Sequence, residues 1–153
     1  MSGKAMKLLK IAAAGMIAGA LLGFFLKWCE HITGKAVYTL LLNIDYLPLL
    51  SDWKLNELGE FFLHLIVSAA VAPALYLLFS TWGWEKKASA YVLGSTVIGL
   101  VYYPFTMLSE RTPALLDAAS ILLWLLGHIL FGSILAVLLI YGEGNRHREK
   151  KHR

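Results

Sequence analysis

Two apolar stretches of this sequence each contain a row of chemically active side chains spaced four residues apart. The first row consists of Glu60, His64 and Ser68, and the second has His128 four residues after Trp124. Residues four apart lie on one face of a helix, so each row would present its polar groups to the same neighbour. Carboxylate, imidazole and hydroxyl groups in such a row can relay protons, ligate a metal or hydrogen-bond an adjacent helix.

Metal chemistry has limited support among these residues. Structural zinc needs more ligands than His64 and His128 supply, and we expect Cys29, the single cysteine, to lie too far away to add one. The two histidines could instead be the axial ligands of one haem. Counting along their helices at ~1.5 Å per residue separates their depths by about 7 Å. We therefore expect no metal and no cofactor, and we keep haem binding as a remote alternative.

Motifs of known enzyme classes do not occur. The sequence contains no nucleotide-binding loop, no nucleophile elbow and no HExxH helix. We therefore expect a protein without enzymatic activity.

The composition indicates which elements would position the polar rows. Hydrophobic residues make up 58% of the chain and charged residues 16%, and the mean hydropathy is +0.64, which is more apolar than a soluble domain. Four apolar blocks have about the 20 residues that a helix needs to cross a bilayer, and they cover residues 8–26, 58–82, 88–108 and 114–141. Only helices satisfy their backbone within one segment in lipid. The sequence thus predicts an all-α polytopic membrane protein with four transmembrane helices in a compact bundle over residues 1–142.

Basic residues predict the orientation of this bundle. Ten of the 14 lysines and arginines fall at the N-terminus, in the connection after the second block or in the tail 143–153. Lysine and arginine accumulate in cytoplasmic segments, so we expect both termini, including this basic tail, in the cytoplasm. We interpret the tail as a stop-transfer segment that fixes the topology, with attraction to anionic lipid headgroups as the alternative, and we expect no nucleic-acid partner.

The segment 28–57 is the one connection longer than a tight turn, and we expect it on the outer side. Its apolar run 37–42 is too short to cross the membrane, so the run lies along the headgroup layer or caps the bundle. A lid and a spacer are both consistent with this pattern.

Small residues predict where the helices pack. Gly15, Gly19 and Gly23 recur at intervals of four on the first predicted helix, and Gly132 lies on the polar row of the last one. Such faces let two helices approach closely in lipid, and the partner helix can belong to the same chain or to another. Pro104 removes a backbone donor, so we expect the third helix to be disturbed near its outer end.

Polar residues at membrane depth are costly and usually face the interior of a bundle. We therefore predict a polar seam between the helices, formed by Glu60, His64, Ser68, Tyr102 and His128. His128 is expected nearest the midplane. It could handle protons, or it could be a neutral histidine that hydrogen-bonds a neighbouring helix.

One family shows a similar arrangement. Four short spans, the step Tyr103-Pro104, and Gly127-His128-Ile-Leu-Phe131-Gly132 in the last helix resemble small bacterial membrane proteins of the YagU-like kind. Ala136 stands where the family pattern would have a second glycine. The resemblance implies a place in the bacterial cytoplasmic (inner) membrane, and it supplies no activity and no site residue.

These observations favour a multi-pass protein that is a structural or accessory component of the bacterial envelope, surrounded by membrane lipids. The alternative is a homo-oligomeric small-solute or proton-coupled transporter whose seam lies around His64 and His128. Four helices are few for a transport path, so this alternative requires further copies of the chain or a partner membrane protein.

Overall fold

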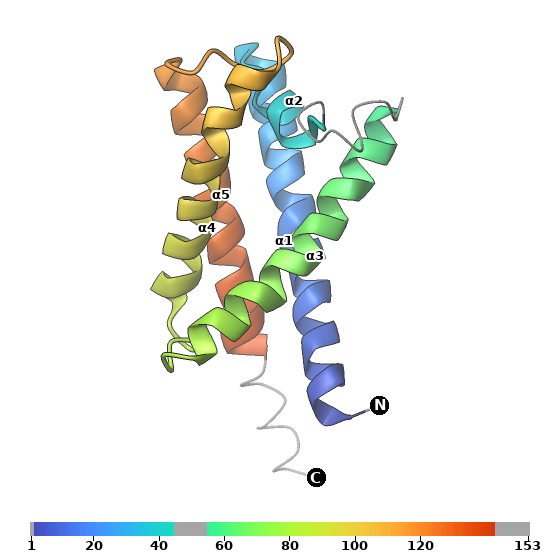
Figure 1. The fold of residues 1–153 in the computed structure, drawn as a ribbon, viewed down its shortest axis with the longest axis vertical. Helices are drawn as coiled ribbons and strands as arrows, with labels where there is room; N and C mark the ends of the chain where they lie inside the picture. Colours follow the sequence, from blue (N-terminus) through green and yellow to red (C-terminus); the bar gives the residue numbers. More distant parts are fainter. Residues whose placement is uncertain (1, 45–54, 143–153) are drawn as a thin grey trace.

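The structure is a computed structural model that describes residues 2–44 and 55–142 (Figure 1). The regular elements of these residues are all helical, which confirms the expected all-α class. They are α1 (Gly3–Thr33), α2 (Val37–Leu42), α3 (Glu57–Ser80), α4 (Ala88–Tyr102), the 3₁₀ helix η1 (Tyr103–Leu108), α5 (Ala118–Ala136) and the π-helical turn η2 (Val137–Tyr141). Four stretches are long and apolar enough to cross a membrane: Gly3–Thr33, Glu57–Ser80, Ala88–Leu108 and Ala118–Tyr141.

The first helix is longer than its apolar block. The Ser2 side chain accepts a hydrogen bond from the amide of Ala5 at 3.4 Å, and α1 ends where Gly34 takes a left-handed conformation with φ of 69°. Gly34 has no Cβ and so adopts this angle without strain. The 31 residues of α1 extend for about 46 Å, which is more than the hydrocarbon core of a bilayer.

The third and fourth spans each show a local departure from a simple helix. The α-helix gives way to a 3₁₀ helix at Tyr103, which confirms the disturbance expected at Pro104. The last span begins at Ala118 instead of residue 114, because the chain first makes a turn in which the amide of Asp117 bonds the Ala114 carbonyl at 3.0 Å.

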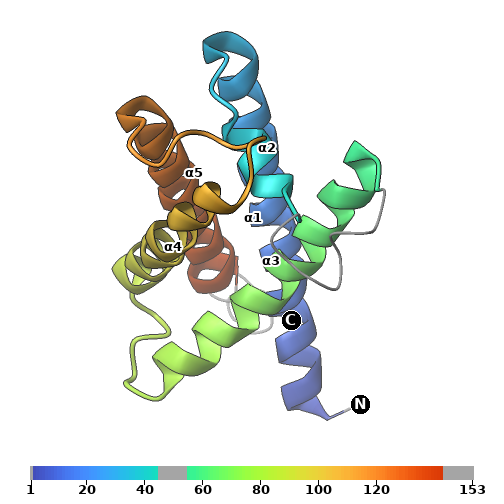
Figure 2. The same cartoon turned by 45° about the horizontal axis from the view of Figure 1, so that its top comes forward.

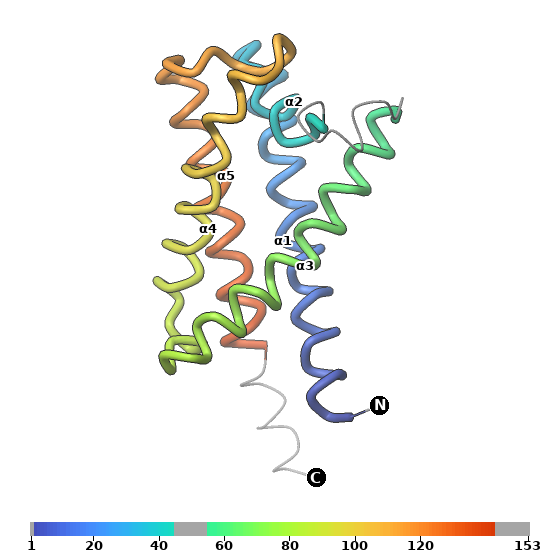
Figure 3. Tube along the Cα trace, in the orientation of Figure 1, coloured from blue at the N-terminus to red at the C-terminus, as the bar shows by residue number. Residues whose placement is uncertain are grey.

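The helices are arranged around α1. Helix α3 crosses α1, α5 packs against α1, and α4 packs against α5 (Figures 1 and 2). Helices α3 and α4 contact one another only sparsely, although a short turn joins them. Figure 3 shows that they diverge away from this turn. The bundle is therefore open between α3 and α4.

The two ends of the bundle differ. The start of α1, the α3–α4 turn and the end of η2 lie at one end, while α2 and η1 lie at the other (Figure 1). Helix α2 folds back onto the bundle and contacts α1, α3 and α5, with Val37 and Leu40 fully buried. Of the two placements expected for the run 37–42, the structure thus has the cap. The remainder of the connection between α2 and α3, 45–54, and the basic tail, 143–153, lie outside the described residues.

The carboxylate of Glu30 fixes α2 in this position. Its Oε2 accepts hydrogen bonds from the amides of Tyr38 and Thr39 at 2.7 and 2.8 Å, and its Oε1 accepts one from the Thr39 hydroxyl at 2.8 Å. These amides belong to the first turn of α2 and have no partner within the helix itself. Glu30, near the end of α1, therefore satisfies the start of α2 directly.

Candidate functional site

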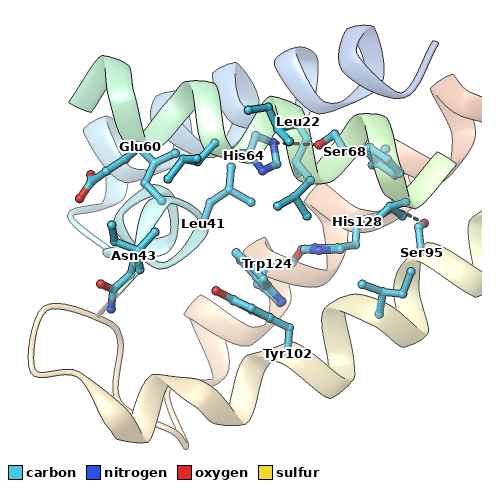
Figure 4. A pocket seen from close by; sticks show the side chains of 18 residues that line it. Leu22, Leu41, Asn43, Glu60, His64, Ser68, Ser95, Tyr102, Trp124 and His128 are labelled. Carbon is cyan, nitrogen blue, oxygen red and sulfur yellow. Dashed lines mark hydrogen bonds between the residues drawn. The ribbon is translucent and has the colours of Figure 1, made fainter. Parts of the chain in front are cut away.

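All five residues of the predicted seam line one cavity of about 270 Å³ (Figure 4). The cavity lies between α3 on one side and α4 and α5 on the other. Glu60, His64 and Ser68 come from α3, Tyr102 from α4 and His128 from α5. Leu41 and Leu42 of α2 complete the lining at the end where α2 caps the bundle. Most of the remaining lining is aliphatic or aromatic, so the cavity is a mainly apolar space with a few polar groups.

The rim of this cavity is apolar and exposed. Ile66 and Val67 on α3 are 49% and 59% exposed, and Ile98 on α4 is 37% exposed. These side chains lie where α3 and α4 diverge. In a membrane, an apolar rim at this position faces acyl chains, so the cavity would open towards lipid.

His64 is tied to the first helix. Its Nε2 lies 3.0 Å from the carbonyl oxygen of Gly19, and 3.5 Å from the hydroxyl of Ser68. A carbonyl oxygen only accepts, so Nε2 carries the proton and donates it to Gly19. The imidazole thus connects α3 to α1.

His128 is more deeply enclosed and is only 8% exposed. Its Nδ1 donates to the carbonyl oxygen of Trp124 at 3.0 Å, one turn earlier in α5, and its ring centroid is 4.5 Å from that of Trp124. Gly99 of α4 lies directly against the ring, since a Cβ built on Gly99 would be 2.5 Å from the His128 Cγ. The ring is therefore held between α4 and its own helix.

Two further hydrogen bonds join α4 to α5 beside His128. The hydroxyl of Ser95 donates to the carbonyl oxygen of His128 at 2.6 Å, and the indole N–H of Trp124 donates to the carbonyl oxygen of Gly99 at 2.8 Å. Trp124 also stacks on Tyr102, with ring centroids 5.8 Å apart and an interplanar angle of 20°. Aromatic surfaces thus form the wall of the cavity next to His128.

Glu60 lies at the outer margin of the cavity. One of its carboxylate oxygens is 3.8 Å from the guanidinium of Arg111, and its side chain is 11% exposed. Glu60 and Leu42 also line a second, polar cleft of about 490 Å³ near α2. The two hollows therefore adjoin at Glu60 and Leu42.

Charged pairs join the segments around this outer cleft. Lys27 forms an ion pair with Glu57, and Lys35 forms one with Asp117 at 2.8 Å. The hydrogen bond from Lys35, reinforced by one from Ser120, lowers the pKa of Asp117. Burial, together with the hydrogen bond that the Tyr38 hydroxyl donates to the Glu57 carboxylate, raises the pKa of Tyr38.

The glycine stripe of the first helix faces α3 of the same chain. A Cβ built on Gly15 would lie 2.6 Å from the Cβ of Ala72, and one built on Gly19 would lie 2.6 Å from the Cβ of Ser68. A Cβ built on Gly23 would lie 2.5 Å from the Cε2 atom of the Phe61 ring. Real Cβ atoms do not approach this closely, so the α1–α3 crossing depends on the absence of side chains.

Gly132 has the same role between α5 and α4. A Cβ at this position would lie 2.6 Å from the carbonyl oxygen of Tyr91 and 2.7 Å from the Cα of Val92. Ala136, four residues further along α5, is also buried, at 2% exposure.

Gly99, Leu41 and Leu42 contribute to the site and were not predicted from the sequence. No spacing or motif indicates that Gly99 lies against an imidazole. Leu41 and Leu42 belong to an apolar run too short to cross the membrane, and this shortness was the available signal that the run packs inward. Among the described residues, no group of three or more His, Cys, Asp and Glu side chains could hold a metal ion.

Comparison of the chain with models of protein families, with curated proteins and with solved structures finds no match. The cavity and the residues that line it are therefore the features of the molecule that bear on its function.

Proposed function

We propose that this chain is a multi-pass protein of the bacterial cytoplasmic membrane, without enzymatic activity, that binds a small apolar molecule dissolved in the membrane. It would serve as an accessory component of the envelope. One observation carries this proposal: five polar residues from α3, α4 and α5, namely Glu60, His64, Ser68, Tyr102 and His128, converge on one cavity whose rim is exposed and apolar. Small-molecule sites are typically apolar hollows with a few convergent polar groups.

The size of the cavity limits the ligand. An apolar protein cavity of about 150 Å³ accommodates benzene. The cavity between α3 and α4 has a volume of about 270 Å³. It therefore suits a molecule of about two fused rings, or a short segment of a larger amphiphile that enters from the lipid.

Photolabelling tests this proposal directly. A small apolar diazirine added to the protein in lipid nanodiscs should label lining residues of α3 and α5 and reach saturation. Ile98→Trp should block this labelling, because the larger side chain projects from the rim into the cavity. Val97→Trp is the matched control, since Val97 is the preceding residue of α4, is 56% exposed and does not line the cavity.

Comparison of Ile98→Trp with Val97→Trp distinguishes labelling by probe bound in the cavity from labelling by probe dissolved in the lipid. Saturable labelling that is lost in Ile98→Trp and kept in Val97→Trp supports a binding cavity. Labelling that rises linearly with probe and is equal in both variants contradicts it.

A second candidate function is transport by a homo-oligomer, as the sequence also suggested. The observation in its favour is that Glu60 and Leu42 line both the cavity and the polar outer cleft, so a solute could pass from one hollow to the other. Flux of a small solute or of protons in proteoliposomes, lost when Glu60 is replaced by Gln, would favour this candidate. A chain that stays monomeric in mild detergent and shows no flux would exclude it.

Haem binding through His64 and His128 stays a prediction, and we place it after ligand binding and transport. Each imidazole donates one N–H to a helix carbonyl, and the other ring nitrogen would have to ligate the iron. The absorption spectrum of the purified protein tests this, because a bis-histidine haem gives a strong Soret band.

A further inference from the structure

We propose that the ligand of this cavity donates a hydrogen bond: it is a mostly apolar ring compound with a hydroxyl or N–H group, and Nε2 of His128 accepts from it. This inference depends on the proposed binding function and adds the chemistry of the ligand.

The hydrogen bonds of His128 define which of its nitrogens can accept. Nδ1 lies 3.0 Å from the carbonyl oxygen of Trp124 and must carry the proton, because that oxygen can only accept. In a neutral imidazole the other nitrogen, Nε2, then has a lone pair and no proton. Within the part of the chain that the structure describes, no group donates a hydrogen bond to this Nε2.

The position of the ring directs Nε2 towards the cavity. Gly99 lies against the side of the ring that contains Cγ, Cδ2 and Nδ1, with distances of 2.5 to 2.8 Å from a Cβ built on that glycine. Nε2 is at the opposite edge, and His128 is a lining residue of the cavity (Figure 4). Nε2 therefore borders a mainly apolar cavity, and a ligand that supplies a donor there would gain a hydrogen bond.

The donors near His128 are already directed at the protein. The Trp124 indole donates to Gly99, the Ser95 hydroxyl donates to the His128 carbonyl, and the His64 Nε2 donates to Gly19. A ligand with only acceptor groups, such as an ether or an ester, would compete with these bonds. A ligand with a hydroxyl or N–H group would leave all of them in place.

The wall beside His128 favours a flat ring. Tyr102 and Trp124 lie nearly parallel, with an interplanar angle of 20°, and the imidazole of His128 is next to Trp124. Planar aromatic rings gain from stacking and edge contacts with such a surface, beyond the burial of their area.

A pair of probes that differ only in the donor tests the proposal. 2-Naphthol has two fused rings and one hydroxyl, and 2-methoxynaphthalene has the same rings but no donor. Both are measured by equilibrium dialysis against the full chain in nanodiscs, with protein-free nanodiscs as the background for partition into lipid. After this correction, we expect 2-naphthol to bind the wild-type protein about 5-fold or more tightly, the effect of roughly one hydrogen bond.

Two variants then assign the acceptor. His128→Phe keeps a ring of similar shape but cannot accept, so the preference for 2-naphthol should disappear while binding of 2-methoxynaphthalene persists. His128→Gln keeps an acceptor oxygen and should preserve the preference. Should the variants fail to fold, the two probes on the wild-type protein still decide whether a donor matters.

Each outcome has a separate meaning. Equal binding of the two probes to the wild-type protein would overturn the requirement for a donor and leave the binding cavity intact. A preference that survives in His128→Phe would overturn the assignment of His128 as acceptor. No binding of either probe above protein-free nanodiscs would count against the proposed binding function itself.

Discussion

The imidazole of His128 makes packing contacts and a hydrogen bond, and these require different properties of the side chain. Its ring packs between Gly99 and Trp124, and its Nδ1 donates to the Trp124 carbonyl. The packing needs a side chain of limited volume, and the hydrogen bond needs a donor. A substitution can satisfy one demand and fail the other, which allows the two to be measured separately.

We expect His128→Gln to be tolerated better than His128→Leu. Glutamine retains an N–H group for the Trp124 carbonyl and an acceptor for the cavity, whereas leucine supplies only volume. Loss of the hydrogen bond should cost the leucine variant on the order of 1 kcal/mol. Thermal unfolding of both variants in the same detergent measures this difference. A glutamine variant that is stable but has lost a pH-dependent activity would instead favour the proton-coupled transporter.

Asp117 provides a prediction about acid stability. Its pKa is lowered in the folded protein, first by the hydrogen bond from Lys35 and then by the one from Ser120. A carboxyl group with a lowered pKa stabilises the fold at pH values above its unfolded pKa of about 3.8, and this contribution is lost as pH falls through the folded pKa. We therefore expect Asp117→Asn to lower the melting temperature at pH 6 and to have a diminishing effect below about pH 4.

Glu110→Gln serves as the control for this acid titration, because Glu110 is an exposed carboxylate in the same connection between η1 and α5. Melting temperatures of the two variants and of the wild-type protein between pH 3 and pH 6 provide the comparison. A difference between Asp117→Asn and wild type that stays constant over this range would mean that the Lys35 pair does not change the pKa of Asp117.

Two pairs of helices pack closely because glycines at the point of contact have no side chain. Gly15, Gly19 and Gly23 place α1 against α3, and Gly132 places α5 against α4. In lipid, helices gain little from burial of apolar surface, so close packing of this kind supplies much of their association. The polar residues of the cavity depend on these crossings, since His64 reaches α1 at Gly19 and Ser95 reaches α5 at the carbonyl of His128.

Gly19→Leu should disrupt the α1–α3 crossing. Even the first carbon of a side chain would lie 2.6 Å from the Cβ of Ser68, and it would displace the helix that carries His64. We expect a loss of about 1–3 kcal/mol or more, the usual cost of overpacking. Gly3→Leu is the control, because nothing lies within 4 Å of a Cβ at Gly3. Equal thermal stability of the two variants would show that the stripe is not a tightly packed interface.

The sequence predicted the four long helices because they follow from the length and spacing of the apolar blocks. Glu60, His64 and Ser68 share a helix face by their spacing, and the cost of polar groups in lipid turns that face inward. The contact between Gly99 and His128 could not be predicted, because it depends on the relative shift of α4 and α5 along their axes. The ion pair between Lys35 and Asp117 could not be predicted either, because these residues are 82 positions apart in the sequence.

The mainly apolar cavity and the polar cleft are two hollows of the molecule, and Glu60 and Leu42 line both of them. The cavity opens through an apolar rim between α3 and α4, and the polar cleft near α2 adjoins it at Glu60 and Leu42. The membrane orientation then decides what each opening meets. If the α2 end is external, the polar cleft faces the outside of the cell and the apolar rim faces lipid.

Cysteine labelling in intact cells determines this orientation. With the native Cys29 replaced by Ala, single cysteines are placed at Lys86, in the turn between α3 and α4, and at Glu110, beyond η1. Both positions are exposed, and Glu110 avoids the ion pair of Arg111 with Glu60. Ten of the 14 lysines and arginines belong to the N-terminal segment, to the connection that contains Lys86 or to the C-terminal tail of the sequence. We therefore expect the end of the bundle that contains the start of α1 and Lys86 in the cytoplasm. A membrane-impermeant maleimide should therefore modify the cysteine at 110 in intact cells, and the cysteine at 86 only after lysis. Modification at 86 without lysis would reverse the orientation, and the polar cleft would then be a cytoplasmic entrance to the cavity.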